Sequence, residues 1–173
     1  MGIVEFNGIA PAVDATAFVA PNAWIIGDVH IGADSSCFFG AVIRGDIQPI
    51  RIGKRTNIQE HALLHTSHDM NSLEIGDSVT IGHRSILHGC RVGSNTLIGM
   101  GATILDNAII GEQCIIGAHS LVTKGTVIAP RSLVMGTPAK IIRTLTPAEI
   151  SSLATSADNY VVLSREYRSQ FSR

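Results

Sequence analysis

The sequence predicts an all-β solenoid, a triangular parallel β-helix followed by one C-terminal α-helix. Aliphatic residues recur at every sixth position over most of the chain, a glycine follows many of them, and a helix-capping motif comes after the last repeat. A six-residue unit is too short for a helix and too regular for loops. Three units per turn close a triangular coil, and each coil is buried on the next around a stack of aliphatic side chains.

Twenty repeats cover the chain, which corresponds to about seven triangular turns. Their apolar positions are Val13, Val19, Ile25, Ile31, Cys37, Ile43, Ile52, Ile58, Leu64, Ile75, Ile81, Leu87, Val92, Ile98, Ile104, Ile110, Ile116, Val122, Ile128 and Val134. The glycines that follow eight of these positions are expected to permit a sharp bend at the end of each repeat. Apolar spacings of three and four, which indicate amphipathic helices, are not sustained in this region.

Three irregularities interrupt the period close together in the chain. The spacing is nine over Ile43–Ile52, eleven over Leu64–Ile75 and five over Leu87–Val92. Extra residues in a solenoid must leave the coil as loops on one face, and loops often carry function. We therefore expect the functional residues near these interruptions.

The repeat stops after Lys140, so we expect a β-helix over residues 1–140 and a helical segment over residues 141–173 that packs on the same domain. Thr146-Pro147-Ala148-Glu149 is a capping box, with Thr146 as N-cap, and it predicts where the helix begins. An apolar stripe at helical spacing predicts that the helix lies along the outside of the prism. Its members are Ile150, Leu153, Ala157, Tyr160, Val161, Leu163, Tyr167 and Phe171.

The composition argues against several classes of partner and location. Thirteen Lys plus Arg against fourteen Asp plus Glu give a net charge of -1, which supplies no field for binding nucleic acid. The longest uncharged stretch, residues 92–105, is too short and polar for a membrane span, and the N-terminus lacks signal-peptide features, so a cytoplasmic protein is expected. Cys37, Cys90 and Cys114 have neither disulfide nor zinc spacing and are expected to be buried apolar residues. Only 16% of the residues are charged, so a partner is expected to cover part of the surface.

Counting repeats predicts which histidines come together. The sixth, ninth and twelfth apolar positions stack on one face of consecutive turns; they are Ile43, Leu64 and Leu87. Arg44, His65 and His88 follow them directly and are expected to form a column with the spacing of paired strands, about 4.8 Å. Two imidazoles at that distance can share one metal ion after modest tilting.

Two further residues of interest belong to the preceding face of the prism. Gln59 follows the eighth apolar position directly, and His83 comes two residues after the eleventh. His83 therefore points away from the column of its own subunit and could meet the column of a neighbouring subunit, which predicts a metal at an interface. His30 and His119 lack such companions and are expected to be surface or turn residues.

Six short segments of the sequence, taken together, form a specific pattern. They are Val42-Ile43-Arg44-Gly45-Asp46, Thr56-Asn57-Ile58-Gln59-Glu60, Leu64-His65, Thr80-Ile81-Gly82-His83, Leu87-His88-Gly89-Cys90 and Leu97-Ile98-Gly99-Met100-Gly101-Ala102. In their order and spacing they resemble the γ-class carbonic anhydrase-like proteins of the hexapeptide-repeat superfamily over essentially the whole chain. The resemblance implies a left-handed β-helix, a homotrimer with three metal sites between subunits, and reversible hydration of CO2 to bicarbonate.

The same resemblance implies that the metal ligands are His65, His83 and His88, with His83 supplied by the neighbouring subunit. Three histidines leave a fourth position for water, whose pKa the metal lowers from about 15.7 toward 7, so that metal-bound hydroxide can attack CO2. Zn2+ is the expected ion, although Co2+ and Fe2+ also suit three imidazoles and water.

The resemblance further implies a set of catalytic residues, Gln59, Arg44, Asp46 and Glu60. Gln59 is expected to orient the bound water or substrate, while Arg44 and Asp46 form an ion pair that helps to hold the interface and the site. A purely structural pair is the alternative, because a guanidinium that holds a carboxylate needs no chemistry to explain it. Glu60 stands where the family pattern usually has Asp, which leaves its role open.

A second departure concerns proton transfer. The prototype of the family carries an acidic loop with a proton-shuttle glutamate, whereas the insertion Thr66–Ser72 contains no Glu. His68 in this loop and Tyr160 on the final helix are candidates for a shuttle; the alternative is that neither serves as one, with His68 solvated and Tyr160 packed in the core.

Two other function classes stay open for this chain. One is a metal-binding trimer with little or no hydration activity that serves as a binding or scaffold protein. The other is an acyl-CoA acyltransferase, since such enzymes share the solenoid and use a histidine as general base. A single base beside a thioester groove, however, does not account for two stacked histidines.

Overall fold

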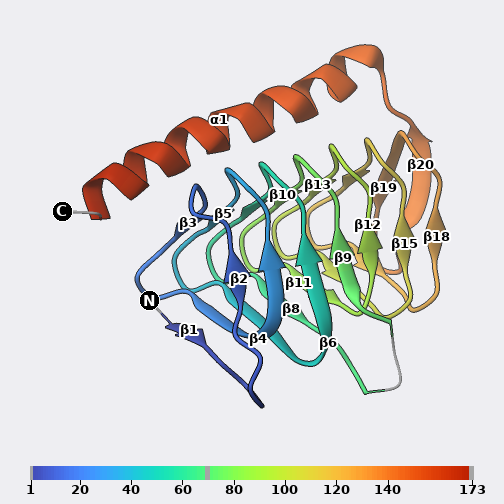
Figure 1. The fold of residues 1–173 in the computed structure, drawn as a ribbon. Coiled ribbons are helices and arrows are strands. Elements are labelled where there is room, and N and C mark those ends of the chain that lie inside the picture. The colour runs from blue at the N-terminus through green and yellow to red at the C-terminus, as the bar shows by residue number, and fades with distance from the viewer. Residues whose placement is uncertain (1, 69–70, 172–173) are drawn as a thin grey trace.

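The chain folds as a left-handed parallel β-helix of about seven turns with one α-helix along its side (Figure 1). The structure is a computed structural model, and it describes residues 2–68 and 71–171. The predicted solenoid with a C-terminal helix is therefore confirmed.

Two faces of the prism belong to one 12-stranded sheet. Its strands are β1 (Gly2–Val4), β2 (Ala12–Val13), β4 (Trp24–Ile31), β6 (Val42–Ile52), β8 (Leu63–His65), β9 (Leu73–Ile75), β11 (Ile86–His88), β12 (Arg91–Val92), β14 (Thr103–Ile104), β15 (Ile109–Ile110), β17 (Leu121–Val122) and β18 (Val127–Ile128). The long strands β4 and β6 run over both faces, because β6 pairs with β8 at one end and with β9 at the other. We call the face that contains β8, β11, β14 and β17 the first face, and the face that contains β9, β12, β15 and β18 the second face.

The third face is an 8-stranded sheet. Its strands are β3 (Phe18–Val19), β5 (Ser36–Cys37), β7 (Asn57–Ile58), β10 (Thr80–Ile81), β13 (Leu97–Ile98), β16 (Ile115–Ile116), β19 (Ser132–Met135) and β20 (Lys140–Thr144). All pairs in this sheet are parallel except β19 with β20, which turns the chain back at the end of the solenoid.

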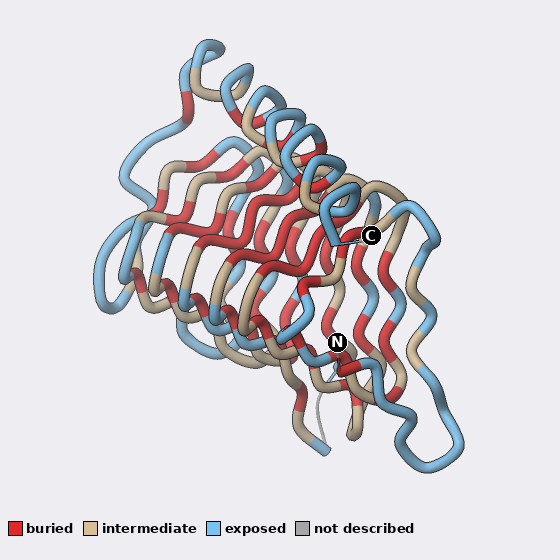
Figure 2. Tube along the Cα trace, turned by 90° about the vertical axis from the view of Figure 1, so that its left-hand side faces the viewer, coloured by how far each residue is buried: buried red, intermediate tan, exposed pale blue. Residues whose placement is uncertain are grey.

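The core is the stack of aliphatic side chains that the six-residue period predicts. Of the twenty apolar repeat positions, all from Ile25 to Val134 are buried, while Val13 and Val19 in the first turn are half-buried. Figure 2 shows buried stretches recurring from coil to coil along the solenoid. Burial of each such side chain contributes about 1.5–3 kcal/mol, so the repeats themselves supply the driving force for folding.

The glycines after the repeats do not make the bends, which corrects the expectation from the sequence. The residues with positive φ come two positions later and are mostly not glycines; with φ of 54–57° they include Asp34, Arg55, Ser78, Arg84, Asn95, Gln113 and His119. A Cβ on Gly99 would lie 2.5 Å from the backbone nitrogen of Ala118 in the next coil. These glycines are therefore required for close approach between coils.

The helix α1 (Pro147–Phe171) begins at the predicted capping box. The Glu149 carboxylate accepts hydrogen bonds from the Thr146 backbone and hydroxyl at 2.8 and 2.9 Å, and the Glu149 N–H donates to Thr146 Oγ1 at 3.3 Å. Leu153, Ala157 and Val161 are buried as the stripe predicts. Leu163 is exposed, because it lies two residues beyond Val161 and so on another side of the helix. No helix formed by the described residues is long and apolar enough to cross a membrane.

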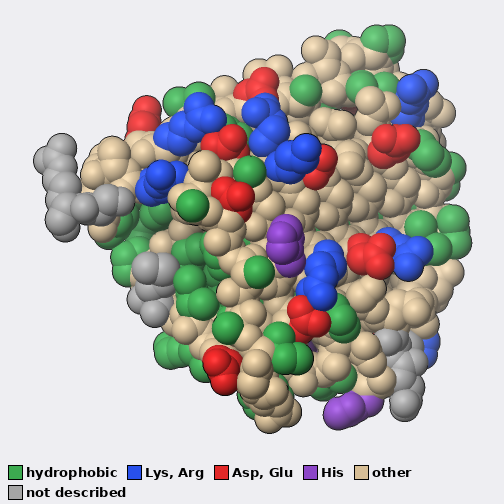
Figure 3. Space-filling view, in the orientation of Figure 1, with side chains coloured by type: hydrophobic (Ala, Val, Ile, Leu, Met, Phe, Trp, Pro, Cys, Tyr) green, Lys and Arg blue, Asp and Glu red, His purple; other side chains and the backbone are tan. Residues whose placement is uncertain are grey.

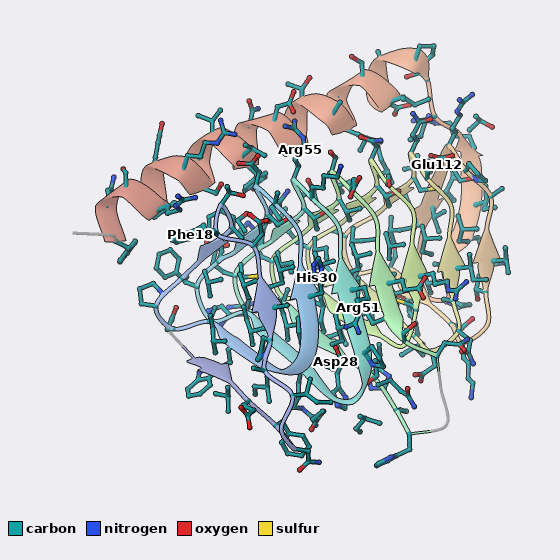
Figure 4. The ribbon with its side chains drawn as sticks, in the orientation of Figure 1. Phe18, Asp28, His30, Arg51, Arg55 and Glu112 are labelled. Carbon is teal, nitrogen blue, oxygen red and sulfur yellow. The ribbon has the colours of Figure 1, made fainter. Side chains whose placement is uncertain are left out.

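An aromatic cluster and two ion pairs fix α1 against the third face. Phe18, whose position Figure 4 labels, stacks on Tyr167 with ring centroids 5.5 Å apart, and Phe38 contacts Tyr160 at 5.8 Å. The ion pairs join Arg55 to Asp158 and Arg165 to Asp34. The helix is thus held at a fixed height along the prism, which also sets the position of Tyr160.

The second face carries charged side chains of both signs, intermixed (Figure 3). Arg51 pairs with Asp28 at 2.6 Å, and Arg91 pairs with Glu74 at 3.3 Å. Figure 4 shows Arg51, Asp28 and His30 together on this side of the prism. Mutual pairing of this kind leaves little net field over the face.

The glycine column yields a stability prediction. Replacing Gly99 by Ala forces a Cβ against the backbone of the next coil, so we expect a loss of about 1–3 kcal/mol or more in the free energy of unfolding. Gly117 is the matched control, because it occupies the same position one turn later and its Cβ would first meet the flexible Met135 side chain at 3.0 Å. Urea denaturation of both variants measures the difference. Equal losses in the two would contradict the close-approach explanation.

Candidate metal centre

Two histidines lie side by side on the first face. The register pairs His88 of β11 directly with His65 of β8, as the repeat count predicts. Their ring centroids are 5.2 Å apart, and Nδ1 of His65 lies 3.2 Å from Nε2 of His88. The parallel pairing of the coils therefore brings two imidazole nitrogens to within ligand distance of each other.

Arg44 and Asp46 of β6 complete this side of the site. Arg44 follows Ile43, which pairs with Leu64, so it lies one coil before His65. Arg44 donates a hydrogen bond to Asp46 Oδ2 at 2.5 Å, and Asp46 Oδ1 lies 3.2 Å from His65 Nε2. Asp46 therefore bridges the Arg44 guanidinium and the His65 imidazole. The Arg44–Asp46 ion pair is thus in direct contact with the histidine pair.

The surroundings shift the pKa values of these groups in consistent directions. Burial, followed by the positive charge of Arg44, lowers the pKa of His65, despite the opposing effect of Asp46. Burial alone would raise the pKa of Asp46, but the hydrogen bond from Arg44 and that from its own backbone lower it overall. At neutral pH the His65 ring is therefore neutral and the Asp46 carboxylate is ionised.

Sequence reasoning missed a further carboxylate, Asp106. It lies in the turn after β14, and its Oδ1 is 2.8 Å from His88 Nδ1. Each histidine of the pair thus has one ring nitrogen on a carboxylate and the other nitrogen facing its partner. Ionised carboxylates only accept hydrogen bonds, so in the neutral rings both facing nitrogens present lone pairs.

The donor set of this pair fits a metal ion. Two nitrogens that are each about 2.0–2.1 Å from zinc lie about 3.3 Å apart, close to the 3.2 Å between His65 Nδ1 and His88 Nε2. Two lone pairs facing each other at this distance repel unless a metal ion or a shared proton lies between them. Among residues 2–68 and 71–171, however, no group of three His, Cys, Asp or Glu side chains is placed to hold a metal within one chain.

His83 lies apart from the pair, in the turn that follows β10 of the third face. Its Nδ1 is 2.6 Å from Glu60 Oε2, and both side chains are more than a third exposed. The carboxylate again holds one ring nitrogen, so the other nitrogen is left available. Glu60, which stands where the family pattern usually has Asp, therefore contacts His83.

Gln59 belongs to the same corner of the prism as His83. It is buried, and its Nε2 donates to Asn57 Oδ1 at 3.2 Å. Tyr160 of α1 hydrogen-bonds to Gln59, but burial and the charge of Glu60 raise the pKa of this phenol. Tyr160 therefore keeps its proton at neutral pH.

The other histidines and Cys90 lie outside these two groups. His30, His61 and His119 are exposed, the last two in corners with positive φ. His68 is exposed in the loop, whose Asp69 and Met70 lie outside the described residues, and its carbonyl accepts a hydrogen bond from Gln48. Cys90 is buried, and burial raises the pKa of its thiol to about 12, which leaves it unreactive.

The candidate site residues therefore form two separate groups, which we call half-sites. One consists of Arg44, Asp46, His65, His88 and Asp106 on the first face. The other consists of Gln59, Glu60, His83 and Tyr160 at the third face. The first can bind a divalent ion through two imidazoles, and the second offers one further imidazole and a buried amide.

Known proteins resemble this chain over most of its length. The family model described as bacterial transferase hexapeptide (six repeats) matches residues 72–105 and 89–124. A carbonic anhydrase of Geobacillus kaustophilus is 46% identical over 166 residues, which cover 96% of this chain and 91% of that protein. Gamma carbonic anhydrase 1, mitochondrial, of Arabidopsis thaliana is 43% identical over 93% of this chain, but the chain spans only 60% of that protein's length.

A solved structure agrees with these relatives. The crystal structure of a hexapeptide transferase family protein from Anaplasma phagocytophilum superimposes with a TM-score of 0.91 at 44% identity. The match covers 96% of this chain and 98% of that one. With a relative of 46% identity matched almost from end to end, the chain belongs to the γ-class carbonic anhydrase-like family of hexapeptide-repeat proteins.

Proposed function

We propose that the protein is a metal-dependent carbonic anhydrase that acts as a homotrimer. His65 and His88 of one subunit and His83 of the next hold the metal ion at each interface. The observation that carries the proposal is the distance of 3.2 Å between His65 Nδ1 and His88 Nε2, with the outer nitrogen of each ring held by a carboxylate. Relatives named as carbonic anhydrases, at 43% and 46% identity, support the reaction.

The surface around the histidine pair supports an interface between copies. Trp24, Leu63 and Ile86 occupy paired positions along the first face and are 50%, 38% and 38% exposed. Exposed apolar side chains in one column beside a half-site favour burial against another subunit. Because one copy supplies two imidazoles and the other supplies the third, a cyclic trimer closes three equivalent sites.

The chain's own residues prepare the site for hydration of CO2. When bound, the metal ion lowers the pKa of a water molecule at an open coordination position toward about 7. Arg44 keeps Asp46 ionised, and Asp46 in turn fixes the ring of His65. Gln59 orients water or substrate through its amide, which Asn57 and Tyr160 hold in place.

Release of the proton is the step for which the chain is least equipped. Hydration converts CO2 and water into bicarbonate and one proton, and that proton must reach solvent. Tyr160 holds its own proton because its pKa is raised, and Glu60 is engaged with His83. His68 in the exposed loop is the side chain through which we expect buffer-assisted transfer to pass.

Zn2+ is the metal we expect, with Co2+ and Fe2+ as ions that the same three imidazoles would accept. A cytoplasmic location stays a prediction from the sequence, although the Arabidopsis relative is named as a mitochondrial protein. CO2 and bicarbonate are the expected substrate and product.

A trimer that binds metal without turnover is the second candidate function. The loop Thr66–Ser72, which contains no Glu, favours it. An acyl-CoA acyltransferase is the third candidate, and the name of the Anaplasma relative favours it. The opposed lone pairs of His65 and His88 argue against the acyltransferase, because a general base needs a single imidazole.

Stopped-flow CO2 hydration tests the proposed reaction. Protein loaded separately with zinc, cobalt and anaerobic ferrous iron is expected to turn over with at least one ion. His88→Ala removes one imidazole of the pair, so we expect activity to fall by roughly a hundredfold or more. His30→Ala is the control, because His30 is exposed and lies on the second face, where it pairs with Ala12 and Arg51.

Two results would redirect the assignment. Stoichiometric metal without turnover in any form would indicate the binding or scaffold trimer. Transfer of an acyl group to an amine by metal-free protein would indicate the acyltransferase.

Mixed trimers test the sharing of the site between subunits. His83→Ala and His88→Ala subunits each lack one ligand, and each variant alone is expected to lose metal. When the two are unfolded together and reassembled in equal amounts, about one quarter of the sites should contain all three histidines. Metal content and hydration activity should recover to that fraction.

The control mixture combines His65→Ala with His88→Ala, which remove ligands from the same half-site. Every site in that mixture lacks a histidine, so no recovery is expected. Recovery in the control, or none in the test mixture, would show that the three ligands do not divide between subunits in this way.

A further inference from the structure

Asp106 is a carboxylate without a role in the reaction as described so far. It follows β14, which pairs with β11 through Ile104 and Leu87, so it comes one coil after His88. Its Oδ1 lies 2.8 Å from His88 Nδ1, and the two side chains are only 21% and 24% exposed. A half-buried carboxylate at this distance from an imidazole forms a strong, directional hydrogen bond.

The backbone is shaped to admit this contact. Gly89 follows His88 with a φ of 49°, and a Cβ there would lie 2.6 Å from Asp106 Oδ1. The turn is held on both sides, since Asn107 N–H donates to the Gly89 carbonyl at 2.7 Å and Gly125 N–H donates to the Asp106 carbonyl at 2.9 Å. The coils therefore fix the backbone on both sides of Asp106, from which its carboxylate reaches His88.

The contact determines which nitrogen of His88 carries the proton. An ionised carboxylate can only accept, so the N–H of a neutral His88 ring must be on Nδ1. Nε2 then has a free lone pair, and Nε2 is the atom that faces His65. In the opposite tautomer Nε2–H would block the position that a metal ion would take.

Similar contacts occur at the other two histidines. Asp46 contacts His65 Nε2, and Glu60 contacts His83 Nδ1. Histidines that bind metals commonly donate their second N–H to a carboxylate, which fixes the tautomer and the ring orientation. Resting on the proposed function for the metal itself, we propose that Asp106 is a positioning residue, which holds His88 in the Nδ1–H tautomer and so keeps Nε2 free for the metal.

Zinc affinity and histidine tautomers test this assignment in the trimer. Asp106→Asn keeps the size of the side chain but can donate from its amide to Nδ1, which favours the wrong tautomer. We expect zinc, measured by competition with a chelator, to bind about 10- to 100-fold more weakly than to the wild type. Nitrogen-15 NMR of metal-free protein should show His88 as Nδ1–H in the wild type and shifted toward Nε2–H in the variant.

Asp28→Asn is the matched control, because Asp28 is also a partly exposed carboxylate in an ion pair, 2.6 Å from Arg51 on the second face. It should change neither zinc affinity nor the His88 tautomer. Unchanged zinc affinity in Asp106→Asn would overturn the proposal. So would an Nε2–H tautomer in the metal-free wild type, a measurement that needs no variant to fold.

The experiment distinguishes failure of the Asp106 assignment from failure of the proposed carbonic anhydrase function. Zinc binding that weakens in Asp106→Asn, in a wild type that does not hydrate CO2, would support Asp106 and reject the carbonic anhydrase. Hydration of CO2 by the wild type, together with equal zinc affinity in the wild type and Asp106→Asn, would support the carbonic anhydrase and reject the role of Asp106.

Discussion

The parallel register between successive coils is the constraint on which the rest of the structure depends. Because each strand pairs with the strand one turn away, residues at the same position in neighbouring repeats become neighbours in space, about 4.8 Å apart. This register stacks the aliphatic core, and it also places His88 beside His65. The same spacing explains the glycine column, since a Cβ on Gly99 would collide with the backbone above it. The parallel register between coils therefore determines both the packing of the core and the position of the two histidines.

A prism with three faces also explains why the three proposed metal ligands of one chain do not come together. Side chains that project from different faces diverge, so His83 of the third face is not placed to complete the pair on the first face of its own chain. A second copy packed against the first face can bring its own third-face corner to the pair. The column of exposed apolar side chains at Trp24, Leu63 and Ile86 gives such packing a driving force. Assembly and metal binding would then depend on each other.

Much of the fold and part of the site could be predicted from the sequence, because both follow from the repeat period. The core and the His65 and His88 pair follow from counting repeats, and the capping box at Thr146 follows from its own sequence motif. Asp106 was missed although it comes two residues after Ile104, the next apolar position in the same stack, so extending the count by one coil would have reached its neighbourhood. The partners of Gln59 could not be counted, because they depend on side-chain directions and on the docked helix. The role of the glycines that follow the repeats could not be predicted, because the sequence of one repeat does not show how closely the next coil approaches it.

The charges of the proposed centre favour a divalent cation over a proton. Among the described residues, the ion pairs of the three histidines bring in the carboxylates of Asp46, Glu60 and Asp106, and Asp46 in turn pairs with the guanidinium of Arg44. Three negative charges against one positive charge leave a net charge of -2, which a divalent ion neutralises and a single proton does not. Buried charges that lack compensation are costly, and the cost rises when a second subunit excludes water from the interface. In the proposed centre, the carboxylates that hold the histidine rings would therefore also favour an ion of charge +2.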